Sequence, residues 1–199
     1  MVASVRTGML LAGGLMAAAA ISCSSATPTG TPGVSRLGKT VLQYQGAEVD
    51  ATLSYRFADT ELGADWLLLD AALTGNSRVA VEVKRENISL RTPAGEEVPL
   101  PAQDEFGQAY RALAATVQRA NVAAEPLDYW AGREPCSLGF LTAPGEGLAL
   151  LSVWVNDQRV CQGRLFFPLP QGVEAGRYEL RIKLPESEVR IPFRLGENE

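Results

Sequence analysis

In the segment Val49-Asp50-Ala51-Thr52-Leu53-Ser54-Tyr55-Arg56-Phe57, apolar and polar side chains alternate at every position. The odd positions are apolar, and the even positions carry aspartate, threonine, serine and arginine. Successive side chains of a β-strand point to opposite faces of its sheet. The segment therefore predicts a strand with one buried face and one solvent-facing face.

Further strand patterns flank this segment on both sides, with turns rich in Gly, Pro and Asn between them. The dense apolar run at 66–73 predicts a strand buried on both faces. Residues 148–155 and 159–167 predict a hairpin across the turn at 156–158. Pro192 indicates that the last strand, near 189–195, lies at a sheet edge. The other predicted strands lie near 79–84, 88–91, 98–101, 136–141 and 178–184.

The residue period changes after Pro101. Four apolar residues at helical spacing, Phe106, Tyr110, Leu113 and Val117, predict one amphipathic helix from near Asp104 to near Asn121. Such a helix either seals an open edge or end of the sheets or, together with the loop after it, forms a lid or a docking face.

Eight to ten strands at this spacing predict a mainly β fold, an antiparallel sandwich with the helix near 104–121 as an insertion. The stretch Ala175-Gly-Arg-Tyr-Glu-Leu-Arg-Ile182 resembles the Gly-x-Tyr-x-Leu closing strand of bacterial immunoglobulin-like domains. That resemblance covers about ten residues and implies an immunoglobulin-like β-sandwich for residues 39–199.

Composition excludes whole classes of function. The chain has no histidine, which removes Ser-His-Asp and Cys-His catalysis and histidine-bound metals. A net charge of −5 argues against nucleic acid as a partner. No calcium-loop or phosphate-loop motif is present in the sequence. We therefore expect no cofactor, no metal and no enzymatic activity.

Two acidic pairs, Glu96-Glu97 and Asp104-Glu105, are the conceivable acid–base groups. Glycoside hydrolysis requires two carboxylates across one cleft, about 5–10 Å apart. Neighbouring acids in a turn and at a helix start are typical of solvated charge, so a carboxylate-based hydrolase is the third hypothesis for this chain.

The N-terminal segment carries an export pattern. Gly8–Ile21 holds fourteen uncharged residues after Arg6, too few for the ~20 that span a bilayer and typical of a signal peptide. The junction Ala20-Ile21-Ser22-Cys23 resembles the lipobox of bacterial lipoprotein precursors, although that family prefers Leu where Ala20 stands. The junction also fits an ordinary signal peptidase site, which would leave an unlipidated secreted protein.

The lipobox resemblance implies a signal peptide at 1–22, a lipidated Cys23 and, with Ser24 after it, sorting to the periplasmic face of an outer membrane in preference to the inner membrane. Residues 24–38 are rich in Ser, Thr, Pro and Gly and cannot form a core. Residues 23–38 are thus predicted to be a flexible tether that links the lipid to the domain at 39–199.

Lipidation of Cys23 would leave Cys136 and Cys161 as an even pair in an exported protein. Such a pair is normally oxidised, so the sequence predicts a Cys136–Cys161 disulfide. The alternative is a pair of buried free thiols.

The loop after the predicted helix, residues 126–133, is the candidate binding surface. It places Tyr129 and Trp130 beside Asp128 and Arg133, and exposed Tyr and Trp are enriched at binding surfaces. Packing of this loop onto the end of the domain would explain the same residues.

Together these observations predict a lipid-anchored cell-envelope protein with a non-enzymatic binding or assembly role toward an envelope partner. The alternative is a carrier of an apolar small molecule, held between the helix stripe and the sheet. A cavity of a few hundred Å3 at that place would favour the carrier.

Lipidation is tested by feeding cells an alkyne analogue of palmitate. We expect the wild-type chain to be labelled and Cys23→Ala to be unlabelled, because the thiol is the acceptor. Equal labelling of the two proteins would contradict the prediction.

Overall fold

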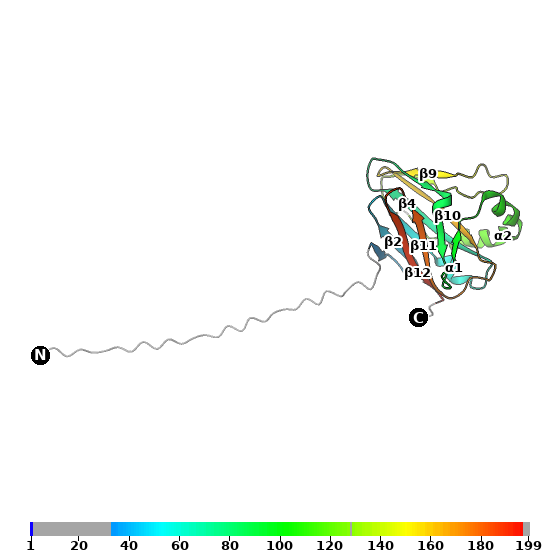
Figure 1. The fold of residues 1–199 in the computed structure, drawn as a ribbon, viewed down its shortest axis with the longest axis horizontal. Helices are drawn as coiled ribbons and strands as arrows, with labels where there is room; N and C mark the ends of the chain where they lie inside the picture. The colour runs from blue at the N-terminus through cyan, green and yellow to red at the C-terminus, as the bar shows by residue number, and fades with distance from the viewer. Residues whose placement is uncertain (2–32, 128, 197–199) are drawn as a thin grey trace.

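The computed structural model describes Met1, residues 33–127 and residues 129–196 (Figure 1). Cys23, the predicted tether up to residue 32, and Asp128 lie outside the described residues. The signal peptide and the lipid anchor therefore stay predictions.

Strands dominate the described chain, as the sequence predicts. They are β1 (Val34–Arg36), β2 (Val41–Gln45), β3 (Val49–Ser54), β4 (Trp66–Gly75), β5 (Val81–Lys84), β6 (Ile88–Arg91), β7 (Glu97–Pro99), β8 (Glu134–Ser137), β9 (Ser152–Val155), β10 (Arg159–Pro168), β11 (Gly176–Lys183) and β12 (Glu188–Leu195). The helices are α1 (Arg56–Thr60), the 3-10 turn η1 (Arg85–Asn87) and α2 (Gln103–Ala123).

The strands form three sheets within the described residues. The order is β1-β2-β3-β4-β10-β8 in a six-stranded sheet, β12-β11-β6-β7 in a four-stranded sheet, and β5-β9 in a two-stranded ribbon. Neighbours pair antiparallel, as predicted, with one departure: β8 runs parallel to β10. The last strand, β12, lies at a sheet edge as its proline predicts.

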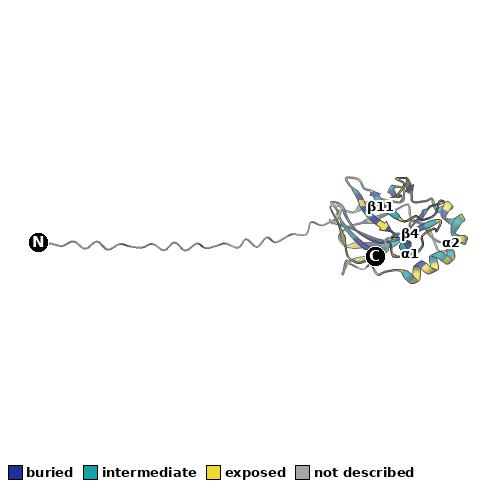
Figure 2. Ribbon diagram, turned by 90° about the horizontal axis from the view of Figure 1, so that it is seen from below, coloured by how far each residue is buried: buried dark blue, intermediate teal, exposed yellow. Residues whose placement is uncertain are grey.

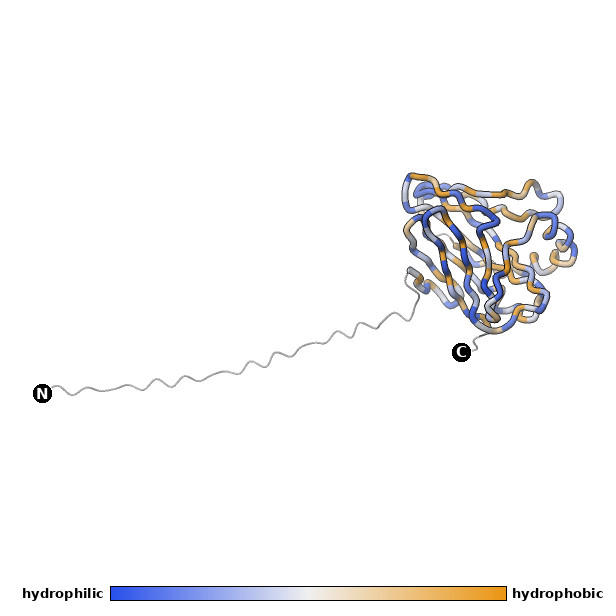
Figure 3. The backbone as a smooth tube through the Cα atoms, in the orientation of Figure 1, coloured by the Kyte–Doolittle hydropathy of each residue, from blue (hydrophilic) through white to orange (hydrophobic). Residues whose placement is uncertain are grey.

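The six-stranded and four-stranded sheets share one hydrophobic core. Leu53 on β3 and Leu69 on β4 face that core from the larger sheet, and Leu180 and Ile191 face it from the smaller one. All four side chains are at most 1% exposed. Figure 3 shows apolar and polar residues alternating along these strands.

The four-stranded sheet has the one wet face that alternation predicts. Tyr178, Leu180 and Ile182 of β11 are buried, whereas the intervening Glu179 and Arg181 form a 2.6 Å ion pair on the outer face. The hydrogen bond that Arg181 Nε donates to Glu179 Oε1 is the main cause of a raised pKa for the Arg181 guanidinium.

The larger sheet departs from the prediction made for residues 49–57. The strand ends at Ser54, because the short helix α1 begins at Arg56. Tyr55 stacks on Phe193 of β12 with ring centroids 5.3 Å apart. The even positions Thr52 and Ser54 are buried rather than solvent-facing, so another layer must cover this face.

Helix α2 supplies part of that layer. Its Phe106 ring lies 4.8 Å from Phe166 on β10 and 6.4 Å from Trp66 on β4, between ring centroids. Register places Phe166 and Trp66 on the face of the six-stranded sheet that points away from the common core. The helix therefore packs on an outer sheet face and does not seal an edge.

The apolar stripe predicted for this helix is the side that packs. Phe106 and Leu113 are buried, and Tyr110 and Val117 are partly buried. Exposed and partly buried residues alternate along α2 in Figure 2. Asp104 lies in the first turn rather than at the N-cap, which is Ala102.

The prediction of a hairpin across residues 156–158 is wrong. β9 and β10 are consecutive, yet β9 pairs with β5 whereas β10 pairs with β4 and β8. The turn separates them because Gly75 donates its N–H to Asn156 O (3.1 Å) at the end of β4. β9 is also shorter than predicted, and residues 148–151 precede it as irregular chain.

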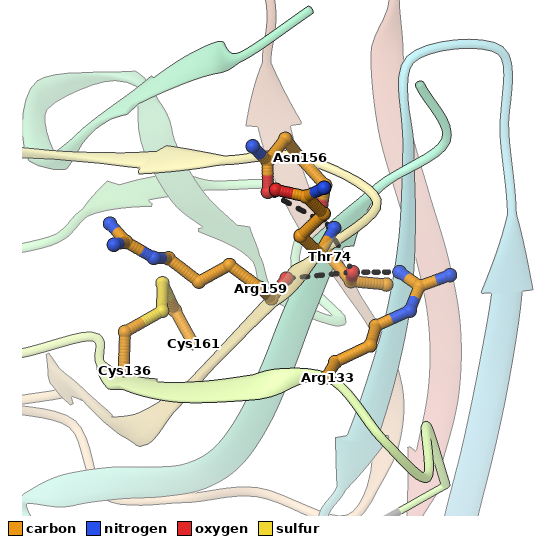
Figure 4. The surroundings of a disulfide bond; sticks show 7 residues. Thr74, Arg133, Cys136, Asn156, Arg159 and Cys161 are labelled. Atoms are coloured by element: carbon orange, nitrogen blue, oxygen red, sulfur yellow. Dashed lines mark hydrogen bonds between the residues drawn. A yellow bond between two sulfur atoms is a disulfide. The ribbon is translucent and has the colours of Figure 1, made fainter. Parts of the chain in front are cut away.

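The disulfide prediction is confirmed: Cys136 on β8 and Cys161 on β10 are joined (Figure 4). The two residues are direct register partners of the parallel pair, with Cα atoms 4.2 Å apart. The bond therefore fastens the four-residue edge strand β8 to its neighbour β10.

Reduction of this disulfide should destabilise the domain. It closes a loop with a sequence separation of 25 residues, for which the chain-entropy model gives ~3 kcal/mol. We expect urea denaturation with dithiothreitol to show a free energy of unfolding lower by about that amount. The control is Cys136→Ala/Cys161→Ala, whose curve should not respond to dithiothreitol; an unchanged wild-type curve would contradict the prediction.

Candidate functional site

A groove of about 480 Å3 lies on the outer face of the six-stranded sheet. One wall is the C-terminal half of α2 and the chain after it, at Val117, Ala124 and Leu127. The opposite wall is the segment after β8, which includes Leu138 and Leu141. Its volume is of the size predicted for a small-molecule cavity, but of the predicted stripe only Val117 lines it, so it lies at the C-terminal end of the predicted place.

The lining of the groove is mixed rather than apolar. Asp70, Arg164 and Gln162 come from the sheet, and Glu125 from the segment after α2. Arg164 and Asp70 are register partners on β10 and β4, and Nε of the arginine donates to Asp70 Oδ1 at 2.8 Å. Their side chains are 12% and 18% exposed, so this pair is largely screened from water.

Arg164 also binds the helix. Its Nη1 donates to Asn121 Oδ1 at 2.8 Å, and Nη2 donates to the Ala120 carbonyl at 3.2 Å. Ala120 O is among the last four carbonyls of α2, which lack partners within the helix. One side chain thus fixes the end of α2 to the sheet floor.

Glu125 covers the face of β3 that alternation predicts to be wet. Its Oε2 accepts hydrogen bonds from Ser54 Oγ at 2.7 Å and from Thr40 Oγ1 at 3.0 Å. Its Oε1 lies 3.7 Å from Arg56 Nη1, in a pair whose arginine is 56% exposed. Ser54 of β3 is therefore buried with a polar partner from the chain after α2, whereas Thr52 Oγ1 is buried without a hydrogen-bond partner among the described residues.

In the predicted binding surface at 128–133, one aromatic side chain packs on the domain and the other is exposed. Trp130 is partly buried on a small cluster formed by Val41, Ala72, Leu127 and Val160, whereas Tyr129 is 45% exposed. The Arg133 guanidinium donates to Thr74 Oγ1 and to Gly75 O (Figure 4).

Thr74 joins that contact to the disulfide region. Its hydroxyl donates to Arg159 O at 2.8 Å, beside the start of β10. Arg133 therefore holds the loop to the end of β4. Of the three described residues predicted for this surface, Tyr129 is the one whose side chain is mainly open to solvent.

A second exposed surface was not predicted. Leu148, Leu150, Leu151 and Trp154 are 92%, 40%, 71% and 54% exposed, and we call them the 148–154 surface. They lie on β9 and the chain before it, along the top of Figure 1. A signal is visible in the sequence, since residues 148–151 form an unbroken apolar run with no alternating polar residues. In β9, by contrast, Val153 and Val155 lie two residues apart and are both buried.

The acidic pairs lie near one another around a different cavity of about 300 Å3, which Glu96, Glu97 and Glu105 line. A hydrogen bond from Ser89 Oγ (2.7 Å) is the main reason that the pKa of the Glu97 carboxyl is lowered. A general acid needs a raised pKa, so this environment is unsuited to acid catalysis by Glu97.

Among residues 33–127 and 129–196, no three histidine, cysteine, aspartate or glutamate side chains lie where they could hold a metal ion together. No helix in that part of the chain is long and apolar enough to cross a membrane. The chain matches no family model, no curated protein and no solved structure.

The loop at 129–133 is tested by two neighbouring substitutions. Trp130→Ala should lower the free energy of unfolding by about 2 kcal/mol, less than for a fully buried Trp, because the ring is partly buried on its cluster. Tyr129→Ala should change it by about 0.5 kcal/mol or less. Urea denaturation measures both, and equal curves for Trp130→Ala and the wild type would show that the ring does not stabilise the fold.

Proposed function

We propose that this chain is a lipid-anchored cell-envelope protein that binds a partner protein, without catalysis, through the 148–154 surface. The observation that supports this is the exposure of Leu148, Leu151 and Trp154, each more than half accessible. Large apolar side chains gathered on one short segment are typical of interaction sites. The envelope location rests on the lipobox pattern at Cys23.

The surroundings of the 148–154 surface fit a protein interface. Trp154 lies opposite Glu82 on the β5-β9 ribbon, and Glu82 pairs with Lys84 at 3.8 Å. Arg85 and Glu86 line a hollow beside Leu151. An apolar centre with a rim of both charges is the anatomy of protein–protein interfaces, and Trp is enriched among their energetically dominant residues.

A membrane surface is the less suitable occupant. The rim carries Glu82 and Glu86 as well as Lys84 and Arg85, so it has no excess of positive charge, and the whole chain has a net charge of −5. Peripheral segments that enter a bilayer interface normally carry Lys and Arg on the polar face, which anionic lipids attract.

We also propose that the two larger sheets form a divergent immunoglobulin-like sandwich. The Tyr178 hydroxyl donates to Glu174 O at 2.9 Å and accepts from Glu174 N at 3.0 Å. Immunoglobulin-like domains use a tyrosine that bonds the backbone a few residues upstream in this way. Burial raises the pKa of this hydroxyl, so it stays a donor at neutral pH.

The groove beneath α2 favours a second candidate function, the binding of a small molecule. Its volume of about 480 Å3 lies within the usual range for ligand sites, about 300–1,000 Å3. Its polar lining indicates a ligand that differs from the purely apolar one predicted from sequence.

Photocrosslinking tests the partner proposal in the cells that make the protein. A benzophenone amino acid replaces Leu151 in one variant and Val122 in another, because Val122 is 90% exposed and lies on a different element, α2. We expect the probe at 151 to capture one defined protein and the probe at 122 not to capture it. Trp154→Ala should reduce that capture at least tenfold, the loss of an energetically dominant residue.

Two results would contradict the partner proposal. One is the same set of products at both positions, and the other is crosslinking at 151 to lipid alone. Urea curves serve as the folding control, since Trp154→Ala removes a side chain that is 54% exposed.

A further inference from the structure

The charges that line the groove beneath α2 do not balance. Asp70 and Glu125 contribute two carboxylates, and Arg164 contributes one guanidinium. All three nitrogens of Arg164 already donate within the protein, to Asp70, Asn121 and Ala120. Three of its five N–H groups are thus taken, and the lining itself carries one more carboxylate than guanidinium, since Arg56, the partner of Glu125, is not among the lining residues.

Acceptor atoms remain open in the groove. Within the described part of the chain, Asp70 Oδ2 accepts no hydrogen bond, since the Arg164 bond goes to Oδ1. Glu125 Oε1 has one neighbour of opposite charge, the exposed Arg56 at 3.7 Å. A pair of that length and exposure is weak in water, so both carboxylates can accept from a further donor.

The end of α2 adds to this negative potential. The helix ends at Ala123, and the groove is lined by the residue that follows, Ala124. The structure describes the whole last turn of α2, and this turn contains no basic residue. Carbonyl groups at a helix C-terminus carry partial negative charge and favour a cation nearby.

The remaining walls are aliphatic. Val117 and Leu127 line one side, and Leu138 and Leu141 line the other. A ligand that matches these walls needs an aliphatic body, and one that matches the open acceptors needs hydrogen-bond donors with positive charge. An ammonium group supplies three donors and no acceptor.

We propose that this groove binds a small molecule with a primary ammonium group on an aliphatic chain. The proposal rests on the second candidate function, small-molecule binding, and is independent of the 148–154 surface. The ammonium lies between Asp70 and Glu125 at the end of α2, and the chain lies against the leucine and valine walls.

Titration of the full chain with hexylamine, followed by amide NMR spectra, tests the proposal. Hexylamine is protonated at pH 7, and hexan-1-ol is the matched uncharged probe. We expect hexylamine to shift the amides of Ala124, Gly139 and Gly163, with a dissociation constant at least tenfold lower than that of hexanol. Glu125→Gln should remove most of that difference, because it keeps an acceptor for Ser54 and Thr40 but loses the charge.

A matched pair of tryptophan substitutions distinguishes binding in the groove from binding on the helix surface. Ala124→Trp should fill the groove mouth and abolish hexylamine binding, whereas Val122→Trp, on the exposed side of the same turn, should leave it unchanged. Nα-acetyllysine methylamide represents a lysine residue within a protein chain, and it should bind no more tightly than hexylamine. Tighter binding would show that the groove takes a lysine side chain of a protein rather than a free small molecule.

The outcomes distinguish this proposal from the function on which it rests. Equal binding of hexanol and hexylamine, unaffected by Glu125→Gln, would overturn the ammonium specificity and keep small-molecule binding. No amide shift in the groove with either probe would overturn both. Binding that Ala124→Trp does not change would show that the probe binds elsewhere.

Discussion

The hydrogen bonds of Arg164 join three elements that are far apart in sequence. The residue lies on β10, pairs with Asp70 on β4, and reaches the last turn of α2 through Asn121 and the Ala120 carbonyl. Because the two side chains are 12% and 18% exposed, removal of either partner would leave the other charge with little water to solvate it. The position of α2, and hence the groove between helix and sheet, depends on this contact together with the Phe106 anchor at the other end.

The six-stranded sheet consequently has two covered faces, and the four-stranded sheet has one. On the outer face of the larger sheet, aromatic packing at Phe106 and Phe166 gives way to polar contacts around Glu125. This change in chemistry along one face produces a groove with aliphatic walls and acidic groups. Leu150 of the 148–154 surface donates its N–H to Gly139 O at 2.7 Å, and Gly139 lines the groove, so the two proposed binding sites are neighbours.

Sequence alone could predict the elements that obey a single periodicity. β11 and β12 alternate strictly because one face meets the core and the other meets water, and α2 carries a stripe because one side packs. The wet face expected for residues 49–57 was wrong because α2 and the chain after it cover that side of the sheet, where Ser54 finds its partner in Glu125, 71 residues away. The pairing of β9 with β5, and the meeting of Asp70, Glu125 and Arg164, likewise depend on contacts between distant residues that periodicity does not encode.

The Cys136–Cys161 bond also determines the covalent topology of the region that carries the 148–154 surface. Residues 136–161 form a closed ring, and the turn at Gly145-Glu146-Gly147 is its exposed rim. A single proteolytic cut at this turn would open the ring without producing two separate chains. The nicked protein would therefore stay joined through the disulfide until it is reduced, with the whole 148–154 surface on the C-terminal side of the break.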